Sequence, residues 1–296
     1  MPNWTIRMLL LVCFALVVPV SLAGPQTQAQ TFHTFITVDV PQALGTVATD
    51  IDDARDIVGF YVDSAGVHHG FVDVNGRIST VDVPGSTGTL AYGISPQFNN
   101  IVGWYTDSNG MQHGFVLSQG RFSRIDVPGA IQTNAFSIYD FVNIVGAFRD
   151  SQGVVHGFQY SLSTKSFTTI DFADSTLTEL FGVTGLGFEV GVYRDSSGVE
   201  HGLLRDRNGQ TTKLDFPGSA ITANEKITLT GFEIVGFHGA SAAGPFHGHF
   251  GPASGTLQNV DFPNATDTRC LGVNDLGEIV GRYTDTRGVI HGFFAK

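Results

Sequence analysis

The sequence is poor in cysteine and in basic residues. Its 296 residues include two Cys, and 16 Lys or Arg stand against 27 Asp or Glu, which gives a formal net charge of −11. A surface of this sign repels phosphate backbones, and no Lys/Arg run interrupts it, so nucleic acid is not an expected partner. The sequence also lacks a Gly-x-Ser-x-Gly elbow, a His-Glu-x-x-His motif and a phosphate-binding glycine loop. No familiar catalytic motif therefore points to an enzyme.

Long hydrophobic runs are absent too, except at the N-terminus. Residues 8–20 form a 13-residue apolar stretch, too short to span a bilayer comfortably. Arg7 precedes it and small residues follow at 21–23, so we predict a signal peptide over 1–23 and a short linker over 24–31. A retained anchor is the alternative. Cleavage would remove Arg7 and change the formal net charge from −11 to −12. We therefore predict a secreted or periplasmic protein without a membrane span.

Loss of the signal peptide would also remove Cys13 and leave Cys270 alone, so no internal disulfide is possible. In the other copies of the repeat described next, the position of Cys270 is held mainly by Ala. We therefore expect Cys270 to be a small buried side chain rather than a reactive thiol.

What the sequence has in abundance is repetition. A unit of about 44 residues recurs six times and reads Thr-x-small-x-Gly, Ile-Val-Gly-x-Tyr, Asp-Ser-x-Gly-x-x-His-Gly-Phe and Asp-Val-Pro-Gly. The histidine of His-Gly recurs every 43 to 46 residues, at His69, His113, His156, His201, His247 and His291. The threonine recurs at Thr46, Thr89, Thr133, Thr178, Thr222 and Thr268. A period of this length is typical of a solenoid or a propeller.

Each unit contains four short strand candidates separated by turn residues. In the second unit they are 89–95, 100–107, 111–118 and 120–127, rich in β-branched and aromatic residues. Asp-Ser-x-Gly predicts a tight hairpin, in which the Asp accepts hydrogen bonds from the following backbone and the Gly takes a positive φ. Four strands per unit predict an all-β, six-bladed β-propeller over residues 32–296. A solenoid of six coils is the alternative.

The two ends of the repeat region complement each other. Residues 32–41 read as a fourth strand alone, whereas residues 288–296 end at a third strand. We therefore predict that the N-terminal strand completes the last blade and closes the ring, which would leave few exposed sheet edges.

The repeat resembles the HAF family of extracellular repeats. The resemblance rests on the Ile-Val-Gly, Asp-x-x-Gly and His-Gly-Phe elements and covers nearly all of the mature chain; His-Gly-Phe stands where the family has His-Ala-Phe. It implies export and a repeat fold, and it implies no activity.

The repeated His and Asp residues suggest a metal site, but the strand order argues against it. His-Gly-Phe falls on the third strand, away from the axis, where six histidines cannot converge on one ion. We expect them to satisfy backbone groups at their hairpins. The acidic run at 49–56, with Asp50, Asp52, Asp53 and Asp56, could suggest calcium, but we expect a solvated loop. No metal or cofactor is predicted.

Departures from the repeat are the better candidates for a site. Glu179 and Arg269 follow the repeated Thr, and Glu225 precedes the repeated Gly position, all near the start of a predicted inner strand. Glu179 and Glu225 are candidate acid and base, and Arg269 could bind an acidic group. Charged side chains at solvated loop ends remain the alternative.

The fifth unit and the aromatic residues add further candidates. "FHGASAAGPFHGHF" loses the hairpin Asp and groups His238, His247 and His249, which could bind metal, transfer protons or do neither. Tyr92, Trp104 and Phe136 could stack on sugar rings, or simply pack in the core.

These observations favour a non-catalytic binding module, which we expect to be a monomer that recognises an extracellular glycan or protein. A carbohydrate-active hydrolase or lyase with its site at the axial opening is the alternative.

Overall fold

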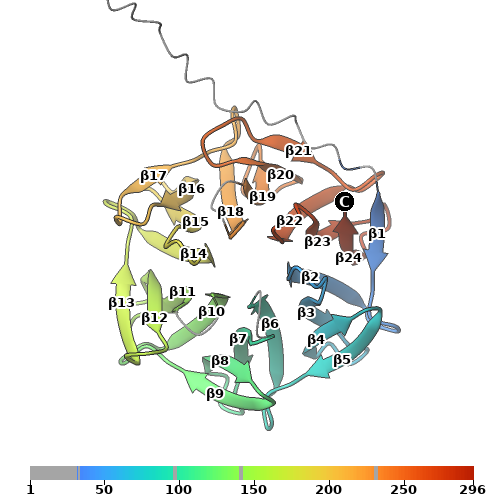
Figure 1. The fold of residues 1–296 in the computed structure, drawn as a ribbon, viewed down its shortest axis with the longest axis horizontal. Helices are drawn as coiled ribbons and strands as arrows, with labels where there is room; N and C mark the ends of the chain where they lie inside the picture. The colour runs from blue at the N-terminus through green and yellow to red at the C-terminus, as the bar shows by residue number, and fades with distance from the viewer. Residues whose placement is uncertain (1–31, 33, 96–98, 140–142, 230–232) are drawn as a thin grey trace, which may run out of the picture. The chain divides into compact units, whose positions relative to one another are not determined.

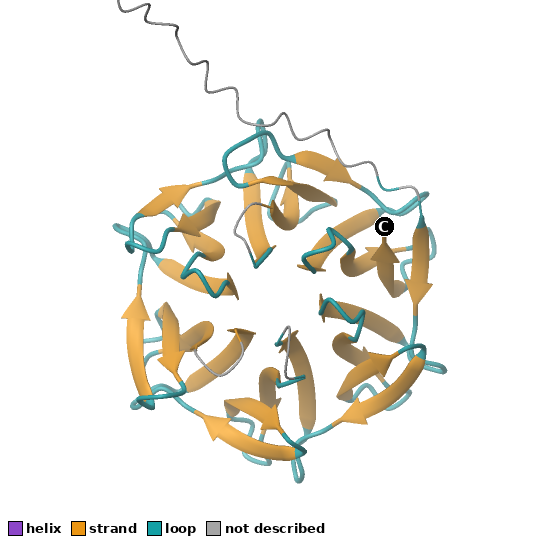
Figure 2. Cartoon of the chain, in the orientation of Figure 1, coloured by secondary structure: helices purple, strands orange, loops and turns teal. Residues whose placement is uncertain are grey.

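The computed structural model describes residues 32, 34–95, 99–139, 143–229 and 233–296. The predicted signal peptide and the predicted linker both lie outside these residues. The described part is all-β: it contains strands and turns and no helix (Figure 2). Accordingly, nothing in it forms a helix long and apolar enough to cross a membrane.

The strands of the described residues pair to form six antiparallel four-stranded units. We number the units one to six along the chain: β2–β5, β6–β9, β10–β13, β14–β17, β18–β21, and β22–β24 together with β1. Units two, three and four are further joined into one sheet by single parallel residue pairs, Gln112 with Gln132 and Val155 with Leu177.

Within each unit the four strands lie side by side, ordered from the centre of the assembly to its edge (Figure 1). The innermost strands are β2 (Gly45–Ile51), β6 (Gly88–Ile94), β10 (Gln132–Tyr139), β14 (Leu177–Val183), β18 (Ile221–Ile227) and β22 (Asp267–Val273). The second strands are β3 (Ile57–Val62), β7 (Ile101–Thr106), β11 (Asn143–Arg149), β15 (Glu189–Arg194), β19 (Glu233–Gly239) and β23 (Ile279–Thr284).

The third and fourth strands complete each unit toward the periphery. The third strands are β4 (His68–Val74), β8 (Gln112–Ser118), β12 (Val155–Ser161), β16 (Glu200–Arg205), β20 (Phe246–Pro252) and β24 (Ile290–Ala295). The outermost strands are β5 (Arg77–Val81), β9 (Arg121–Ile125), β13 (Ser166–Ile170), β17 (Thr211–Lys213), β21 (Gln258–Val260) and β1 (Phe35–Val38).

The predicted partnership of the two ends is present in the strand pairing. β1 runs antiparallel to β24, with Phe35 opposite Ala295 and Val38 opposite Gly292. In addition, β2 of the first unit contacts β22 and β23 of the last. A solenoid would keep its first and last units apart, so these contacts favour the ring over the solenoid.

The glycine of Ile-Val-Gly is required by the close approach of the first two strands. A Cβ at Gly59 would lie 2.0 Å from the carbonyl oxygen of Val47, and the equivalent glycines meet the same clash at 1.9–2.0 Å. The predicted hairpin is also confirmed. Asp63 accepts hydrogen bonds from the amides of Ala65 and Val67, and Gly66 has a φ of 83°.

The repeated threonine connects one unit to the next. Its Oγ1 accepts a hydrogen bond from the backbone amide that follows the outermost strand of the preceding unit, and this bond is present in all six copies at 3.0–3.1 Å. In the third unit the donor is Val127 and the acceptor is Thr133, which is 1% exposed. The bond fixes the turn that leads from the edge of one unit to the centre of the next.

Cys270 has the position that the repeat predicted. Its side chain is fully buried and free, and it packs in the core cluster of the last unit. Burial raises the pKa of the thiol well above its ordinary value, which keeps it protonated and unreactive.

Replacing Thr133 with Val should destabilise the protein by about 1–3 kcal/mol, because the isosteric change leaves the buried amide of Val127 without an acceptor. Urea unfolding measured at equilibrium gives the change. Thr168→Val on the exposed face of β13 is the matched control and should change stability by less than about 0.5 kcal/mol. Equal effects of the two substitutions would contradict the role given to Thr133.

Candidate functional site

A β-bulge at the same place in every inner strand brings the departures from the repeat to the axis. The register between the first two strands shifts once in each unit, for example between Ala48 and Asp50 and between Asn224 and Lys226. A bulge inserts an extra residue and redirects its side chain. The inserted residues are Thr49, Tyr92, Phe136, Phe181, Glu225 and Leu271. This is the position, just before the repeated Gly, that the sequence singled out.

Aromatic residues at this level fill part of the axis. The rings of Tyr92 and Phe136 lie 4.9 Å apart, and those of Phe136 and Phe181 lie 5.0 Å apart. Trp104 packs against the same cluster and does not line the axial pocket described next. Packing is therefore the role that the structure shows for Phe136 and Trp104.

A cavity of about 340 Å³ opens near the starts of the inner strands, among units one, two, five and six, and we call it the axial pocket. Its polar side chains are His68, Tyr92, Glu225, Arg269 and Arg282. Its apolar side chains are Val47, Phe60, Val62, Phe237, Leu271 and Ile290. Three of the sequence-predicted site residues, Tyr92, Glu225 and Arg269, thus line one cavity, and its volume lies at the lower end of the range of small-molecule sites.

Two arginines share one carboxylate at the wall of the axial pocket. Asp267 lies 3.4 Å from Nε of Arg269 and 3.7 Å from Nη2 of Arg282. The guanidinium of Arg269 also lies over the rings of Phe237 and Phe246, 4.8 and 4.2 Å from their centroids. Burial and the neighbouring Arg269 lower the pKa of Arg282, although an arginine stays charged under all ordinary conditions.

Arg282 was missed at the sequence level, although the repeat contained a signal for it. It follows the Gly of Ile-Val-Gly, where the other units carry Phe60, Trp104, Ala147, Val192 and Phe237. It is the single charged residue at this position. The same comparison that selected Arg269 would have found it.

Glu225 is the most deeply buried polar group of the axial pocket. It is 3% exposed, and its Oε2 has no hydrogen-bond partner. Burial raises the pKa of this carboxyl to about 8, helped by the nearby Glu179 and opposed by Lys226. Glu225 is therefore mostly protonated at neutral pH and can donate a hydrogen bond.

Glu179 lies on the same axis but lines a different and much smaller cavity, with Gln132, Asn134 and Arg149. Burial raises the pKa of its carboxyl to about 7. Glu179 contributes to the raised pKa of Glu225, but the two candidate catalytic carboxylates do not line one shared cavity. A substrate in the axial pocket would meet Glu225 alone.

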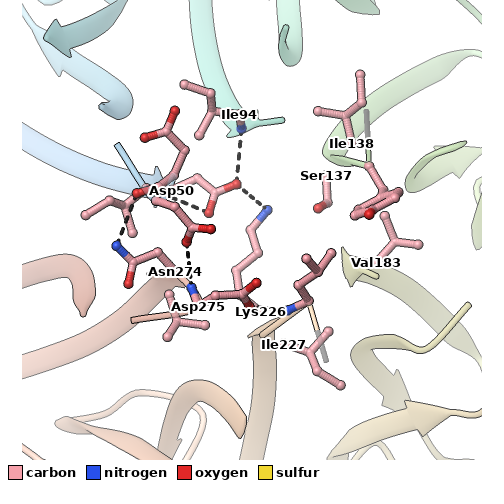
Figure 3. Close-up of a pocket in the computed structure, with 15 residues that line it drawn as sticks. Asp50, Ile94, Ser137, Ile138, Val183, Lys226, Ile227, Asn274 and Asp275 are labelled. Atoms are coloured by element: carbon pink, nitrogen blue, oxygen red, sulfur yellow. Dashed lines mark hydrogen bonds and ion pairs between the residues drawn. The ribbon is translucent and has the colours of Figure 1, made fainter. Parts of the chain in front are cut away.

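The opposite ends of the inner strands are closed by a buried ion pair (Figure 3). Nζ of Lys226 lies 3.2 Å from Asp50 and donates to the carbonyl of Phe136 at 3.0 Å, so one side chain connects units one, three and five. Asp50 also accepts from the amides of Ile51 and Ile94. The cavity beside this pair, about 60 Å³, shares no lining residue with the axial pocket.

The expectation of a solvated loop at 49–56 is therefore wrong for most of its acidic residues. Asp50, Asp52 and Asp56 are 6%, 3% and 5% exposed, and Asp53 alone is exposed. Asp50 lies inside the inner strand, where the bulge turns it toward Lys226, and Asp52 accepts from the amide of Asp56 across the strand end.

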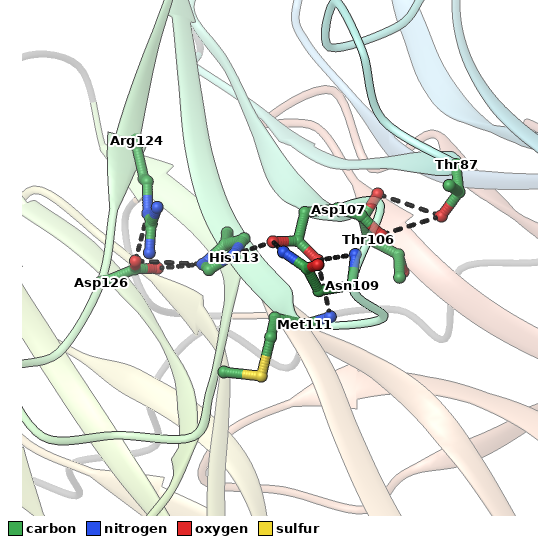
Figure 4. A network of polar contacts seen from close by, with 8 residues as sticks. All are labelled: Thr87, Thr106, Asp107, Asn109, Met111, His113, Arg124 and Asp126. Atoms are coloured by element: carbon green, nitrogen blue, oxygen red, sulfur yellow. Dashed lines mark hydrogen bonds and ion pairs between the residues drawn. The ribbon is translucent and has the colours of Figure 1, made fainter.

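The repeated histidines contact carboxylates. In the second unit His113 lies between Asp126, 3.1 Å from Nδ1, and Asp107, 3.5 Å from Nε2 (Figure 4). Every unit has the first contact, including His291 with Asp39 at 2.7 Å. The backbone was expected as the partner of the repeated His and Asp. This is confirmed for the hairpin Asp and wrong for the histidine, which joins the hairpin Asp to the Asp that follows the outermost strand in every unit except the fifth, where the hairpin Asp is missing.

The fifth unit replaces apolar core residues with polar ones. His238 takes the place of Tyr or Phe and stacks on Phe216 with ring centroids 3.5 Å apart. His249 takes the place of Phe71 and is fully buried, with its Nε2 3.1 Å from Oδ1 of Asn224. Nδ1 of each of these two histidines has no partner. In the described part of the chain, no three His, Cys, Asp or Glu side chains are grouped to hold a metal ion.

Comparison with solved structures shows the fold class. The chain resembles the Aleuria aurantia lectin bound to Fucα1-6GlcNAc, with a TM-score of 0.55 and 12% identity over 88% of this chain and 93% of the lectin. It also resembles TolB from Acinetobacter baumannii, with a TM-score of 0.54 and 14% identity over 85% of this chain. A further match is the Trypanosoma rangeli sialidase, with a TM-score of 0.52 and 8% identity.

The protein therefore has a β-propeller fold, the fold of the Aleuria lectin, which is described as a six-bladed β-propeller. The chain spans 64% of the TolB chain and 54% of the sialidase chain. No known protein family matches the sequence, and no curated protein matches it. At these identities the likeness shows the fold alone.

The buried histidines of the fifth unit should make the protein acid-sensitive. Burial lowers the pKa of His238 to about 4 and that of His249 to about 3, whereas an unfolded histidine titrates near 6.5. The unfolded state therefore binds more protons below about pH 6.5, and stability is lost as the pH falls from there toward 4.

The double variant His249→Phe with Asn224→Ala, which introduces the Phe and Ala of units one to three, should remove part of this loss. Between pH 7 and 4.5 its free energy of unfolding should fall by roughly 2 kcal/mol less than that of the wild type. Urea unfolding across this range measures both proteins. Parallel pH profiles would show that His249 does not titrate in this window.

Proposed function

We propose that the protein is an exported, six-bladed β-propeller whose axial pocket binds a small extracellular ligand, the end of a glycan chain. The observation that carries the proposal is the axial pocket itself. It gathers Glu225, Arg269 and Arg282, three charged residues at positions where the other units mostly carry uncharged ones. A concave, mostly apolar site with a few convergent polar groups is the usual form of a ligand site.

The proposed ring has six blades and is closed by the N-terminal strand. The pairing of β1 with β24 supports it, as does the contact between His291 and Asp39, which are 252 residues apart in sequence. Closure matters to the proposed function because the axial pocket is bounded by units five and six on one side and units one and two on the other.

Export is part of the same proposal. The resemblance to the HAF repeats and the signal-peptide pattern at 1–23 support it, and the presence of a glycan lectin among the structural neighbours is compatible with it. We propose that the protein acts as a monomer and is secreted or periplasmic.

Binding without catalysis fits the pocket better than hydrolysis. A glycosidase needs two carboxyl groups about 5–10 Å apart on either side of the scissile bond. Glu225 faces the axial pocket and Glu179 lines a separate cavity. Phe60, Phe237 and Tyr92 give the pocket the aromatic surface on which a sugar ring can pack.

The test is binding of a panel of oligosaccharides to the purified protein, with retained and released species identified by mass spectrometry. We expect at least one to be retained unchanged. Val47→Phe should weaken its binding by about tenfold or more, since it fills the axial pocket at a position where other units carry the longer Leu90, Glu179 and Arg269.

Val154→Phe is the matched control, because Val154 is exposed on a hairpin away from the axis. It should bind as the wild type does. Retention that Val47→Phe leaves unchanged would place the site elsewhere. Cleaved products would replace the binding module with a hydrolase or lyase, and Glu225→Gln would then test the catalytic carboxyl.

A further inference from the structure

We propose that the ligand of the axial pocket is an acidic sugar, whose single carboxylate is held by Arg269 and Arg282 and receives a hydrogen bond from the side chain of Glu225. This inference rests on the proposed function and adds the chemical class of the ligand. It is carried by three features of the pocket: unbalanced charge, an unpartnered buried polar atom, and limited volume.

The axial pocket has more positive than negative charge. Arg269 and Arg282 have one carboxylate between them, that of Asp267, and its distances of 3.4 and 3.7 Å are long for charge-assisted hydrogen bonds. Asp267 is also engaged by the backbone amide of Phe246 at 3.0 Å. One positive charge is left over, in a protein whose formal net charge is −11. The surplus matches a monoanion better than a dianion such as a phosphate monoester.

Both guanidinium groups are positioned rather than free in solution. The side chains of Arg269 and Arg282 are 25% and 19% exposed. Arg269 is held over Phe237 and Phe246, which leaves its edge available to a ligand. A planar guanidinium presents paired N–H groups that match a carboxylate, and partial burial strengthens that contact over one made in water.

The second feature is the unpartnered oxygen of Glu225. A buried polar atom without a partner costs stability, and such an atom facing a cavity points to a ligand that supplies the missing bond. Oε2 of Glu225 has no partner in a side chain that is 3% exposed and lines the pocket. In its protonated form this carboxyl is a donor, and the carboxylate of a ligand is its natural acceptor.

The third feature is size. The axial pocket holds about 340 Å³ and is separated from the cavity beside Lys226, with which it shares no lining residue. A polymer therefore has no path along the axis between the two cavities, and the pocket receives the end of a chain or a free monosaccharide. The walls formed by Val47, Phe60 and Leu271 suit the apolar face of one sugar ring.

This arrangement couples ligand binding to a proton. When Glu225 loses its proton, its negative charge competes with the ligand for the two arginines and repels the ligand carboxylate. The charged or titratable groups around Glu225 are Lys226, Glu179, Arg269, Arg282, Tyr92 and His68. Because the pKa of Glu225 is about 8, affinity for an acidic sugar should fall as the pH rises from 7 to 9.

The experiment compares matched pairs of methyl glycosides by isothermal titration calorimetry with the full-length protein. The pairs are methyl β-D-glucuronide with methyl β-D-glucoside and methyl α-D-galacturonide with methyl α-D-galactoside, and methyl β-D-glucoside 6-sulfate is added as a second monoanion. We expect one uronide to bind about tenfold or more tightly than its neutral partner.

Variants separate the contributions of the three side chains. Arg282→Met and Arg269→Leu, the latter matching Leu90 of the second unit, should remove the preference for the uronide. Arg287→Met is the control, since it removes the same charge from an exposed hairpin of the same unit. Glu225→Gln should keep binding the uronide at pH 9, where the wild type loses affinity about tenfold, because the amide keeps a donor and cannot ionise.

Each remaining outcome overturns the inference in a distinct way. Equal binding of uronide and neutral sugar, both abolished by Val47→Phe, would leave the proposed function standing and remove the acidic ligand. Tighter binding of the 6-sulfate would replace the carboxylate with a sulfate ester. Absence of binding by every probe, together with no retained glycan in the panel, would overturn both proposals.

Discussion

The convergence of the inner strands on a single axis is the constraint on which the rest of this structure depends. Each unit places one strand at the centre, so residues at equivalent positions face one another there. The glycine of Ile-Val-Gly lets the second strand of each unit approach the first. In the first unit, for example, there is no room for a Cβ beside the carbonyl of Val47. The bulge then directs one extra side chain of each unit inward. Small sequence differences between units therefore meet at one place.

Three levels of the axis show what this convergence produces. At one end, Asp50 and Lys226 form a buried ion pair that joins three units. In the middle, Tyr92, Phe136 and Phe181 pack ring against ring. At the other end the packing is incomplete, and a cavity lined by Arg269 and Arg282 remains. The buried ion pair is a means of fixing the relative positions of the units more than a source of stability, since desolvation offsets much of the attraction.

Much of the fold could be predicted from the sequence because the same pattern of strand and turn residues occurs six times. The hairpins, the pairing of the N-terminal strand with β24 and the burial of Cys270 follow from the spacing of Asp-x-x-Gly, the unequal ends of the chain and the small residues at one position. The Asp partner that follows the outermost strand could not be predicted, because it lies 13 to 15 residues from the histidine in units one to five and 252 residues from His291.

The candidate site could be predicted only in part, and the bulge is the physical reason. Strict alternation places residues such as Glu225 on the same face as the residue two positions earlier, but it does not reveal the bulge that shifts the face of the residues that follow. It also cannot show that Asp50, the residue after the bulge residue of its own unit, is buried against Lys226. Tyr92, Glu225 and Arg269 were selected for being unusual and do meet in one cavity, whereas Glu179, His238 and Trp104 were equally unusual and lie outside it.

The most direct test of the account is to map where a ligand touches the protein. Backbone amide shifts of the deuterated protein would be followed by NMR while methyl β-D-glucuronide is added. The account predicts shifts concentrated at the starts of the inner strands, around Val47, Phe60, Arg269 and Arg282. Shifts confined to the Lys226 end, or to the outermost strands, would contradict it, as would the absence of any shift at saturating concentration.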